Sequence, residues 1–93
     1  MTIQEDFHRA MLAIYDQCSA IGYRPRDFRR MVLQYKGVEA AKLLIHKPET
    51  SGLARLAALG RLDLSMEMLM LTAPYTALFT EQELNIARLR LKP

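Results

Sequence analysis

The sequence has few of the residues that fix a fold by covalent or metal cross-links. Its 93 residues include one cysteine, Cys18, two histidines, His8 and His46, and no tryptophan. A single cysteine excludes an internal disulfide, and a zinc site takes three or four side-chain ligands at spacings that these residues do not have. We therefore predict no metal site and expect both histidines to lie at the surface. With no disulfide to maintain, we expect the reducing cytoplasm.

Long apolar runs are also missing. No stretch reaches the roughly 18 apolar residues with which a helix crosses a bilayer. The first residues, Met1 to His8, are acidic and amphipathic, unlike the basic and then apolar start of a signal peptide. We therefore expect no membrane partner.

The motifs of common catalytic sites are absent as well. There is no glycine-rich phosphate loop, nucleophile elbow or nucleotide fingerprint. Two acidic pairs, Glu5 with Asp6 and Glu81 with Glu83, each lie in the first turn of a predicted helix, where the helix dipole favours acids. Cys18 lies on an inward helical stripe with no activating partner. We predict that the chain is not an enzyme and has no catalytic or cofactor-binding residue, no cofactor and no small-molecule substrate.

The composition is that of a globular protein. Hydrophobic residues make up 51% of the chain and charged residues 25%. The length fits one domain, residues 1–93. A net charge of +3 and an isoelectric point near 9.3 allow an acidic partner without requiring one.

The first helix is the most clearly marked. Thr2 and Glu5 have capping-box spacing, and Gly22 supplies a left-handed residue to end the helix. Its apolar positions recur at steps of three and four and form one stripe: Ile3, Phe7, Ala10, Met11, Ile14, Cys18 and Ile21.

Two shorter helices follow. Pro25 fits the first position of the second helix, since its missing N–H needs no partner there. Gly37 is expected to break this helix, and the third is expected over Val38–His46, closed by Lys47 and Pro48, because the residue before a proline avoids helical geometry.

The stretch 52–71 is the most apolar of the chain. We expect a helix capped by Ser51 that ends before Gly60, then a corner with Leu62 and Leu64 buried. The segment 65–71 alternates polar and apolar residues in part, so both helix and extended strand are open. Helix is favoured, because no second strand exists to satisfy the backbone of the first.

The last helix begins at Thr80, with Glu83 again at capping-box spacing. Its cations, Arg88, Arg90 and Lys92, fit the preference for positive charge at a helix C-terminus. The sequence as a whole predicts an all-α fold, a compact single-domain bundle of five to six short helices.

A cluster of cations surrounds the second helix, opposed only by Asp27. These residues are the candidate phosphate contacts: Arg24, Arg26, Arg29, Arg30 and Lys36. Three of the arginines fall opposite the apolar stripe, with Leu33 among them, and such a face is able to lie along phosphates. The second and third helices are also spaced like a helix-turn-helix. A solvated outer face explains the same pattern.

Apolar residues off the core stripes form the candidate protein interface: Leu33, Ile86 and Leu89. The last helix is apolar on both faces, since Ile86 and Leu89 lie opposite Leu84. Either the fold buries this helix on two sides, or one side meets another chain.

Several stretches together resemble a small uncharacterised helical domain found in bacteria. They are Phe7, Met11 and Tyr15; Gly22-Tyr23 and Phe28; Gly37-Val38-Glu39-Ala40-Ala41-Lys42-Leu43-Leu44; Leu59-Gly60-Arg61-Leu62-Asp63-Leu64-Ser65; Leu78-Phe79-Thr80-Glu81; and Ile86-Ala87-Arg88. The resemblance covers nearly the whole chain and implies an all-helical domain that stands alone or is appended to larger proteins, some of nuclease or defence type. It implies no activity.

These observations favour a non-catalytic protein–protein interaction module, whose partner is another protein or a second copy of the chain. The alternative is a nucleic-acid-binding accessory domain that uses the basic face of the second helix.

Overall fold

A computed structural model describes residues 2–48 and 51–92, without the side chain of Ser51. In these ranges the chain forms six α-helices and two 3-10 turns, and no strand. They are α1 (Ile3–Ala20), α2 (Arg26–Tyr35), α3 (Gly37–Ile45), α4 (Ser51–Ala58), η1 (Leu62–Leu64), α5 (Met66–Met70), η2 (Tyr75–Leu78) and α6 (Glu81–Leu91). The predicted all-α class is confirmed. The cap expected from Ser51 depends on a side chain outside the described part.

Both ends of α1 lie where the sequence predicts, although the capping box of Thr2 and Glu5 forms only in part. At its start, Thr2 Oγ1 accepts a hydrogen bond from the N–H of Glu5 at 3.1 Å. At its end, Gly22 has a φ of +86°. The N–H groups of Gly22 and Tyr23 bond back to the carbonyls of Ser19 and Cys18 at 3.1 and 2.9 Å, so the last carbonyls of the helix are paired.

The junction between α2 and α3 differs from the prediction. Pro25 is the N-cap of α2 rather than its first residue, and the residue that breaks the helix is Lys36, with a φ of +73°. Gly37 instead begins α3, where an added Cβ would stand 2.6 Å from the Cα of His8. The glycine is thus needed for the close approach of α3 to α1. His8, expected at the surface, is half-buried and accepts a hydrogen bond from the Gly37 N–H at Nδ1, 3.0 Å away.

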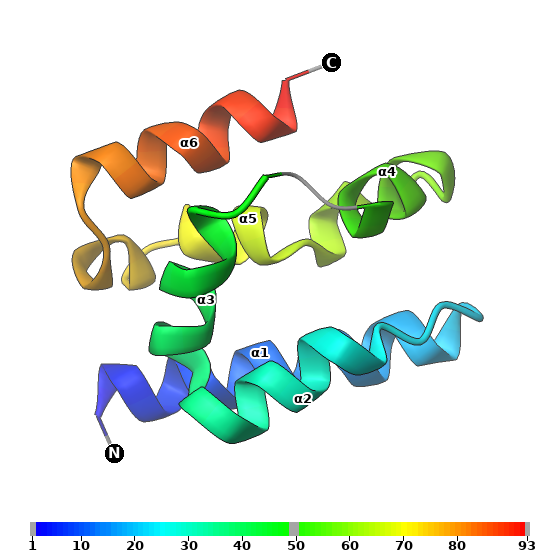
Figure 1. The fold of residues 1–93 in the computed structure, drawn as a ribbon, viewed down its shortest axis with the longest axis horizontal. Coiled ribbons are helices and arrows are strands. Elements are labelled where there is room, and N and C mark those ends of the chain that lie inside the picture. Colours follow the sequence, from blue (N-terminus) through cyan, green and yellow to red (C-terminus); the bar gives the residue numbers. More distant parts are fainter. Residues whose placement is uncertain (1, 49–50, 93) are drawn as a thin grey trace.

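The helices are arranged around α1, which contacts α2, α3, α5 and both 3-10 turns. In Figure 1, α1 and α2 lie side by side along one edge of the molecule, α6 runs along the opposite edge, and α3 and α5 lie between. The globule measures 31 × 26 × 21 Å. Four α1 side chains are fully or nearly fully buried: Phe7, Met11, Ile14 and Cys18. The predicted inward stripe therefore forms the centre of the core.

The segment after α4 is helical, which decides between the two structures left open for 65–71. Gly60, with a φ of +70°, ends α4, and η1 turns the corner with Leu64 buried. Ser65 then caps α5, because its Oγ accepts from the N–H of Met68 at 3.1 Å. The methionines on either side of Met68 are buried, so this short helix packs one face on the core.

The capping box of α6 is confirmed. Thr80 Oγ1 accepts from the Glu83 N–H at 3.1 Å, and Glu83 Oε1 accepts from the Thr80 N–H at 2.9 Å. Leu84 and Ala87 are buried, and the partly buried Ile86 also packs against the core. The fold itself therefore covers most of the apolar surface of α6.

Candidate functional site

The cations of the second helix form an open depression on the outside of α1 and α2. It is lined by six residues, which we call the arginine face: Tyr15, Arg26, Arg29, Arg30, Leu33 and Gln34. The three arginines are exposed, and Leu33, which follows them on the same helix face, is 48% exposed. Tyr15 comes from α1 and completes the depression. The side-by-side packing of the two helices thus adds an aromatic ring to the basic cluster.

Two contacts orient the guanidinium groups of this face. Arg30 Nη2 donates to Asp27 Oδ1 at 2.8 Å, a pair one helical turn apart and open to solvent. The Arg29 guanidinium lies over the Tyr15 ring, 5.4 Å from its centroid. Exposed contacts of these kinds each contribute about 1 kcal/mol or less. An incoming anion therefore competes with weak partners.

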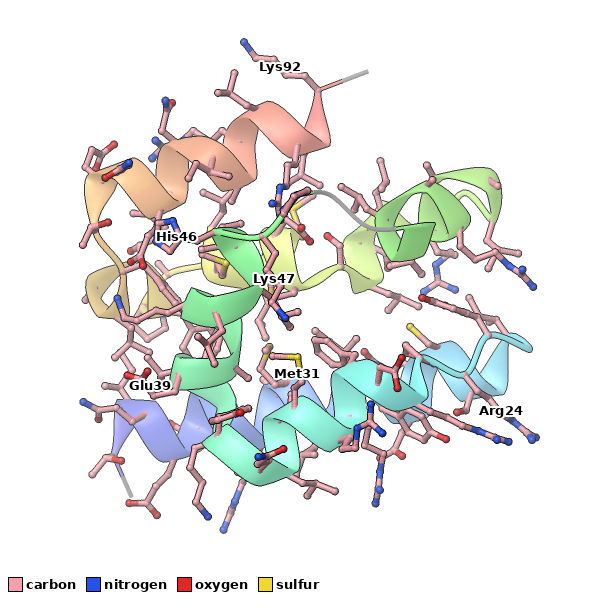
Figure 2. The ribbon with its side chains drawn as sticks, in the orientation of Figure 1. Arg24, Met31, Glu39, His46, Lys47 and Lys92 are labelled. Atoms are coloured by element: carbon pink, nitrogen blue, oxygen red, sulfur yellow. The ribbon has the colours of Figure 1, made fainter. Side chains whose placement is uncertain are left out.

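The other two predicted phosphate contacts do not line this depression. Arg24 lies in the connection between α1 and α2, at one end of the molecule (Figure 2), and lines a separate, deeper pocket. Lys36 follows the last residue of α2, about 9 Å along the helix axis beyond Arg30, and does not line the depression. The structure therefore brings together three of the five cations.

The composition and contacts of α3, which would be the recognition helix of a helix-turn-helix, do not favour that interpretation. The α3 sequence contains one cation, Lys42, whose Nζ donates to Glu83 Oε1 at 2.8 Å. A recognition helix needs donors free to reach base edges. The start of α3 is also pressed against α1 at Gly37. Nucleic-acid contact, if made, falls to the arginine face.

The residues of the predicted protein interface do not form one surface. Leu33 lies on α2, whereas Ile86 and Leu89 lie on α6 at the opposite edge of the molecule (Figure 1). Ile86 packs against the core, and Leu89 is 56% exposed. The sequence left two explanations for the apolar residues on both faces of α6: burial within the fold or contact with another chain. Burial within the fold explains Ile86, whereas Leu89 stays exposed.

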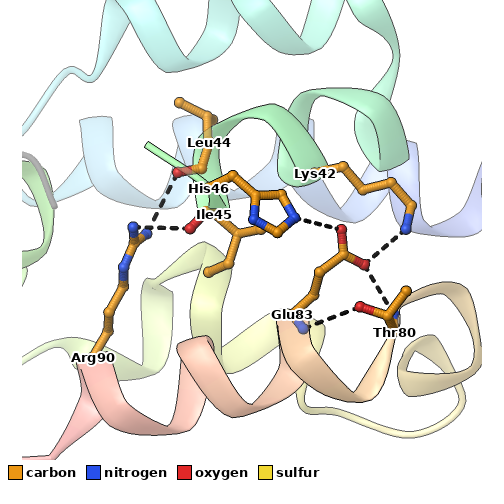
Figure 3. A network of polar contacts seen from close by, with 7 residues as sticks. All are labelled: Lys42, Leu44, Ile45, His46, Thr80, Glu83 and Arg90. Carbon is orange, nitrogen blue, oxygen red and sulfur yellow. Dashed lines mark hydrogen bonds and ion pairs between the residues drawn. The ribbon is translucent and has the colours of Figure 1, made fainter. Parts of the chain in front are cut away.

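Glu83 holds α3 and α6 together through a network that sequence reasoning missed (Figure 3). Its side chain is 6% exposed; Oε1 accepts from Lys42 Nζ at 2.8 Å, and Oε2 lies 3.1 Å from His46 Nε2. Burial alone raises the pKa of Glu83, but the hydrogen bonds from Lys42, the Thr80 N–H and His46 outweigh burial and lower the pKa to about 2. At neutral pH this carboxyl is therefore a fixed anion rather than a proton donor.

Arg90 makes a second link between α6 and the end of α3. Its guanidinium donates to the carbonyls of Leu44 at 3.5 Å and Ile45 at 3.0 Å, and to that of Lys47. It also pairs with Glu67 Oε2 of α5 at 3.3 Å. From the sequence, Arg90 was expected to interact with the C-terminal end of its own helix, α6. In the structure its guanidinium instead pairs with the carbonyls at the C-terminal end of α3.

The chemistry-bearing side chains of the described ranges do not gather into a metal centre. No three histidine, cysteine or acidic residues come together as a ligand set there. Cys18 is buried, and burial raises the pKa of its thiol, which leaves it in the unreactive protonated form at neutral pH.

Comparison with known proteins provides no relative: no family model, no curated protein and no solved structure matches the chain. What the structure shows is a small all-helical domain with a basic face. None of its described helices has the length and apolar content to span a bilayer. The bacterial origin and the attachment to nuclease- or defence-type proteins, implied by the sequence resemblance, remain expectations.

Proposed function

We propose that the chain is a non-catalytic interaction module that binds an acidic protein segment through the arginine face. The observation that carries this proposal is Leu33, half-exposed on the same face of α2 as three arginines, in a depression that also contains Tyr15. Solvation of a charged face requires no exposed leucine on it. Arginine and tyrosine around an apolar anchor are instead the residues that dominate protein interfaces.

The energies at this face favour a protein over a bare polyanion. Burying the exposed half of Leu33 contributes about 1 kcal/mol. Each exposed arginine–carboxylate pair adds about 0.2–1 kcal/mol, and salt screens that part but not the leucine contact. The fitting partner has carboxylates next to an apolar side chain, as an acidic amphipathic helix does.

The test is a titration against a labelled synthetic amphipathic peptide, with leucines on one face and glutamates elsewhere, followed by fluorescence anisotropy. Leu33→Ser is expected to weaken binding several-fold, and Leu43→Ser, at an equally exposed leucine of α3, is the matched control. Arg26→Glu/Arg29→Glu/Arg30→Glu is expected to abolish binding. If the peptide does not bind, or Leu33→Ser binds as wild type does, the proposal fails.

Nucleic-acid contact is the second candidate function, and the Arg29–Tyr15 stack is what favours it. Cations beside an aromatic ring suit phosphates and stacked bases. Labelled duplex DNA and single-stranded RNA, titrated at low and near-physiological salt, separate the two functions. Tight binding that weakens steeply with salt and ignores Leu33→Ser would make this function the lead.

Self-association is a third arrangement, and Leu89 is the residue on which it now depends. Because Ile86 supports the core, its replacement by glutamate tests stability rather than association. Sedimentation of the wild-type chain and of Leu89→Glu at rising concentration is the measurement. A mass that rises in wild type and not in the variant would identify a second copy as the partner.

A further inference from the structure

A deeper pocket lies on the other side of α2 from the arginine face. It has a volume of about 500 Å³ and opens between the α1–α2 pair and the segment from α4 to α5. Its walls are mainly apolar: Ile14, Phe28, Met31, Leu53, Leu56 and Met66. Figure 2 shows Met31 pointing from α2 toward the interior. Pockets of this volume and lining hold drug-sized organic molecules.

One carboxylate in the wall of this pocket has acceptor positions to spare. Glu67 lines the pocket with a side chain that is 9% exposed. Its Oε2 is 3.3 Å from Arg90, while Oε1 accepts no hydrogen bond from the residues that the structure describes. Arg90 divides its donors among three backbone carbonyls as well. A carboxylate offers about four acceptor positions, so Glu67 is able to accept a further hydrogen bond from a donor on a ligand.

The charged residues around the pocket limit the net charge of a ligand that carries this donor. Arg24 and Arg26 line it beside one acid, Asp27, and Arg90 lies next to Glu67. The excess of arginines repels a cationic ligand, and the Glu67 carboxylate repels an anionic one. A neutral ligand with an apolar body avoids both.

We infer that this pocket binds a neutral aromatic molecule whose single N–H or O–H donates to Glu67 Oε1. Indole and phenol groups have this chemistry: a flat apolar ring system with one donor at its edge. The ligand site is independent of the proposed function, since of the arginine face only Arg26 lines both cavities.

Two matched ligands test the inference. The first is 2-phenylindole, and the second is 1-methyl-2-phenylindole, which has the same rings without the N–H. Because the chain has no tryptophan, fluorescence excited beyond tyrosine absorption reports only the ligand. We expect wild type to bind the first ligand at least tenfold more tightly than the second, the effect of one hydrogen bond to a charged acceptor.

Variants at the acceptor connect the preference to Glu67. Glu67→Leu is expected to bind both ligands equally, whereas Glu81→Gln, at an exposed carboxylate of α6, is expected to behave as wild type. Glu67→Gln keeps a carbonyl acceptor and is expected to keep a smaller preference, which preserves the test if Glu67→Leu does not fold. The unfolding midpoint provides a second readout, since a ligand of the native state raises it.

The results that overturn the inference are equally definite. They are no binding of 2-phenylindole, equal affinity of the two ligands for wild type, or a preference that survives in folded Glu67→Leu. Competition by free indole or by N-acetyl-tryptophanamide then separates a small-molecule source from an indole side chain of a protein.

Discussion

Acid should destabilise this domain chiefly through Glu83. The folded-state pKa of about 2 lies below the ordinary 4.5, a difference equivalent to about 3 kcal/mol. Because the folded pKa is the lower one, the unfolded chain binds more protons between these values. The contribution is therefore complete above pH 4.5 and disappears as the pH falls toward 2. For a domain stable by about 5–14 kcal/mol, this is a substantial share.

Glu83→Gln isolates that contribution. Glutamine retains an acceptor for the capping box but leaves Lys42 and His46 without their counter-charge. We expect the variant to be about 3 kcal/mol less stable than wild type at pH 7, and to approach wild type near pH 2. Urea unfolding followed by circular dichroism at a series of pH values measures both. Other carboxyls, such as Asp63, titrate in both proteins and cancel in the difference.

Glu81→Gln is the matched control for the same chemical change two residues away. Glu81 pairs with Arg88 at 3.0 Å, but its side chain is 81% exposed, so its loss is expected to cost less than about 1 kcal/mol. The reasoning would be refuted if Glu83→Gln lost stability between pH 4.5 and 2 as steeply as wild type. It would also be refuted if the two variants had the same stability at pH 7.

Three further outcomes follow from contacts described above. Gly37→Ala should lower the free energy of unfolding by about 1–3 kcal/mol despite the better helix propensity of alanine, because the new Cβ meets the His8 backbone; an unchanged urea midpoint would contradict this. Arg90→Met should lower the free energy of unfolding by about 3 kcal/mol in the same assay, whereas Arg88→Met, at an exposed arginine, should lower it by less than about 1 kcal/mol. Equal effects of the two substitutions would argue against the contacts of Arg90 with α3. Cys18 should react with a thiol reagent only as fast as the domain opens, and rapid labelling of the native protein would disprove its burial.

The local features of the fold were predictable because their signals lie close together in sequence. The caps at Thr2 and Thr80 act on residues three positions away, and the glycines that end α1 and α4 act within five. Apolar periodicity placed Phe7 and its neighbours correctly. Such features need no knowledge of what packs against the helix.

The features that were missed depend on partners far along the chain. Glu83 reaches Lys42 over 41 positions, and Arg90 reaches Leu44 over 46. A local interpretation assigned both charges to the dipole of their own helix. The same limit misplaced the break at Gly37, because only docking on α1 reveals why that glycine is needed. It also hid Tyr15, which lies off the inward stripe of α1 and joins the arginine face only once α2 packs beside it.

The contacts of α3 bear on the order in which the domain assembles. The N–H of its first residue donates a hydrogen bond to His8 of α1, and its last carbonyls accept hydrogen bonds from Arg90 of α6. Lys36, the N-cap residue, makes no capping hydrogen bond with its side chain. Nine residues are too few for a helix to persist alone in water. Both ends of α3 are thus paired only once α1 and α6 are in place, so we expect residues 37–45 to become stably helical after these two helices have docked.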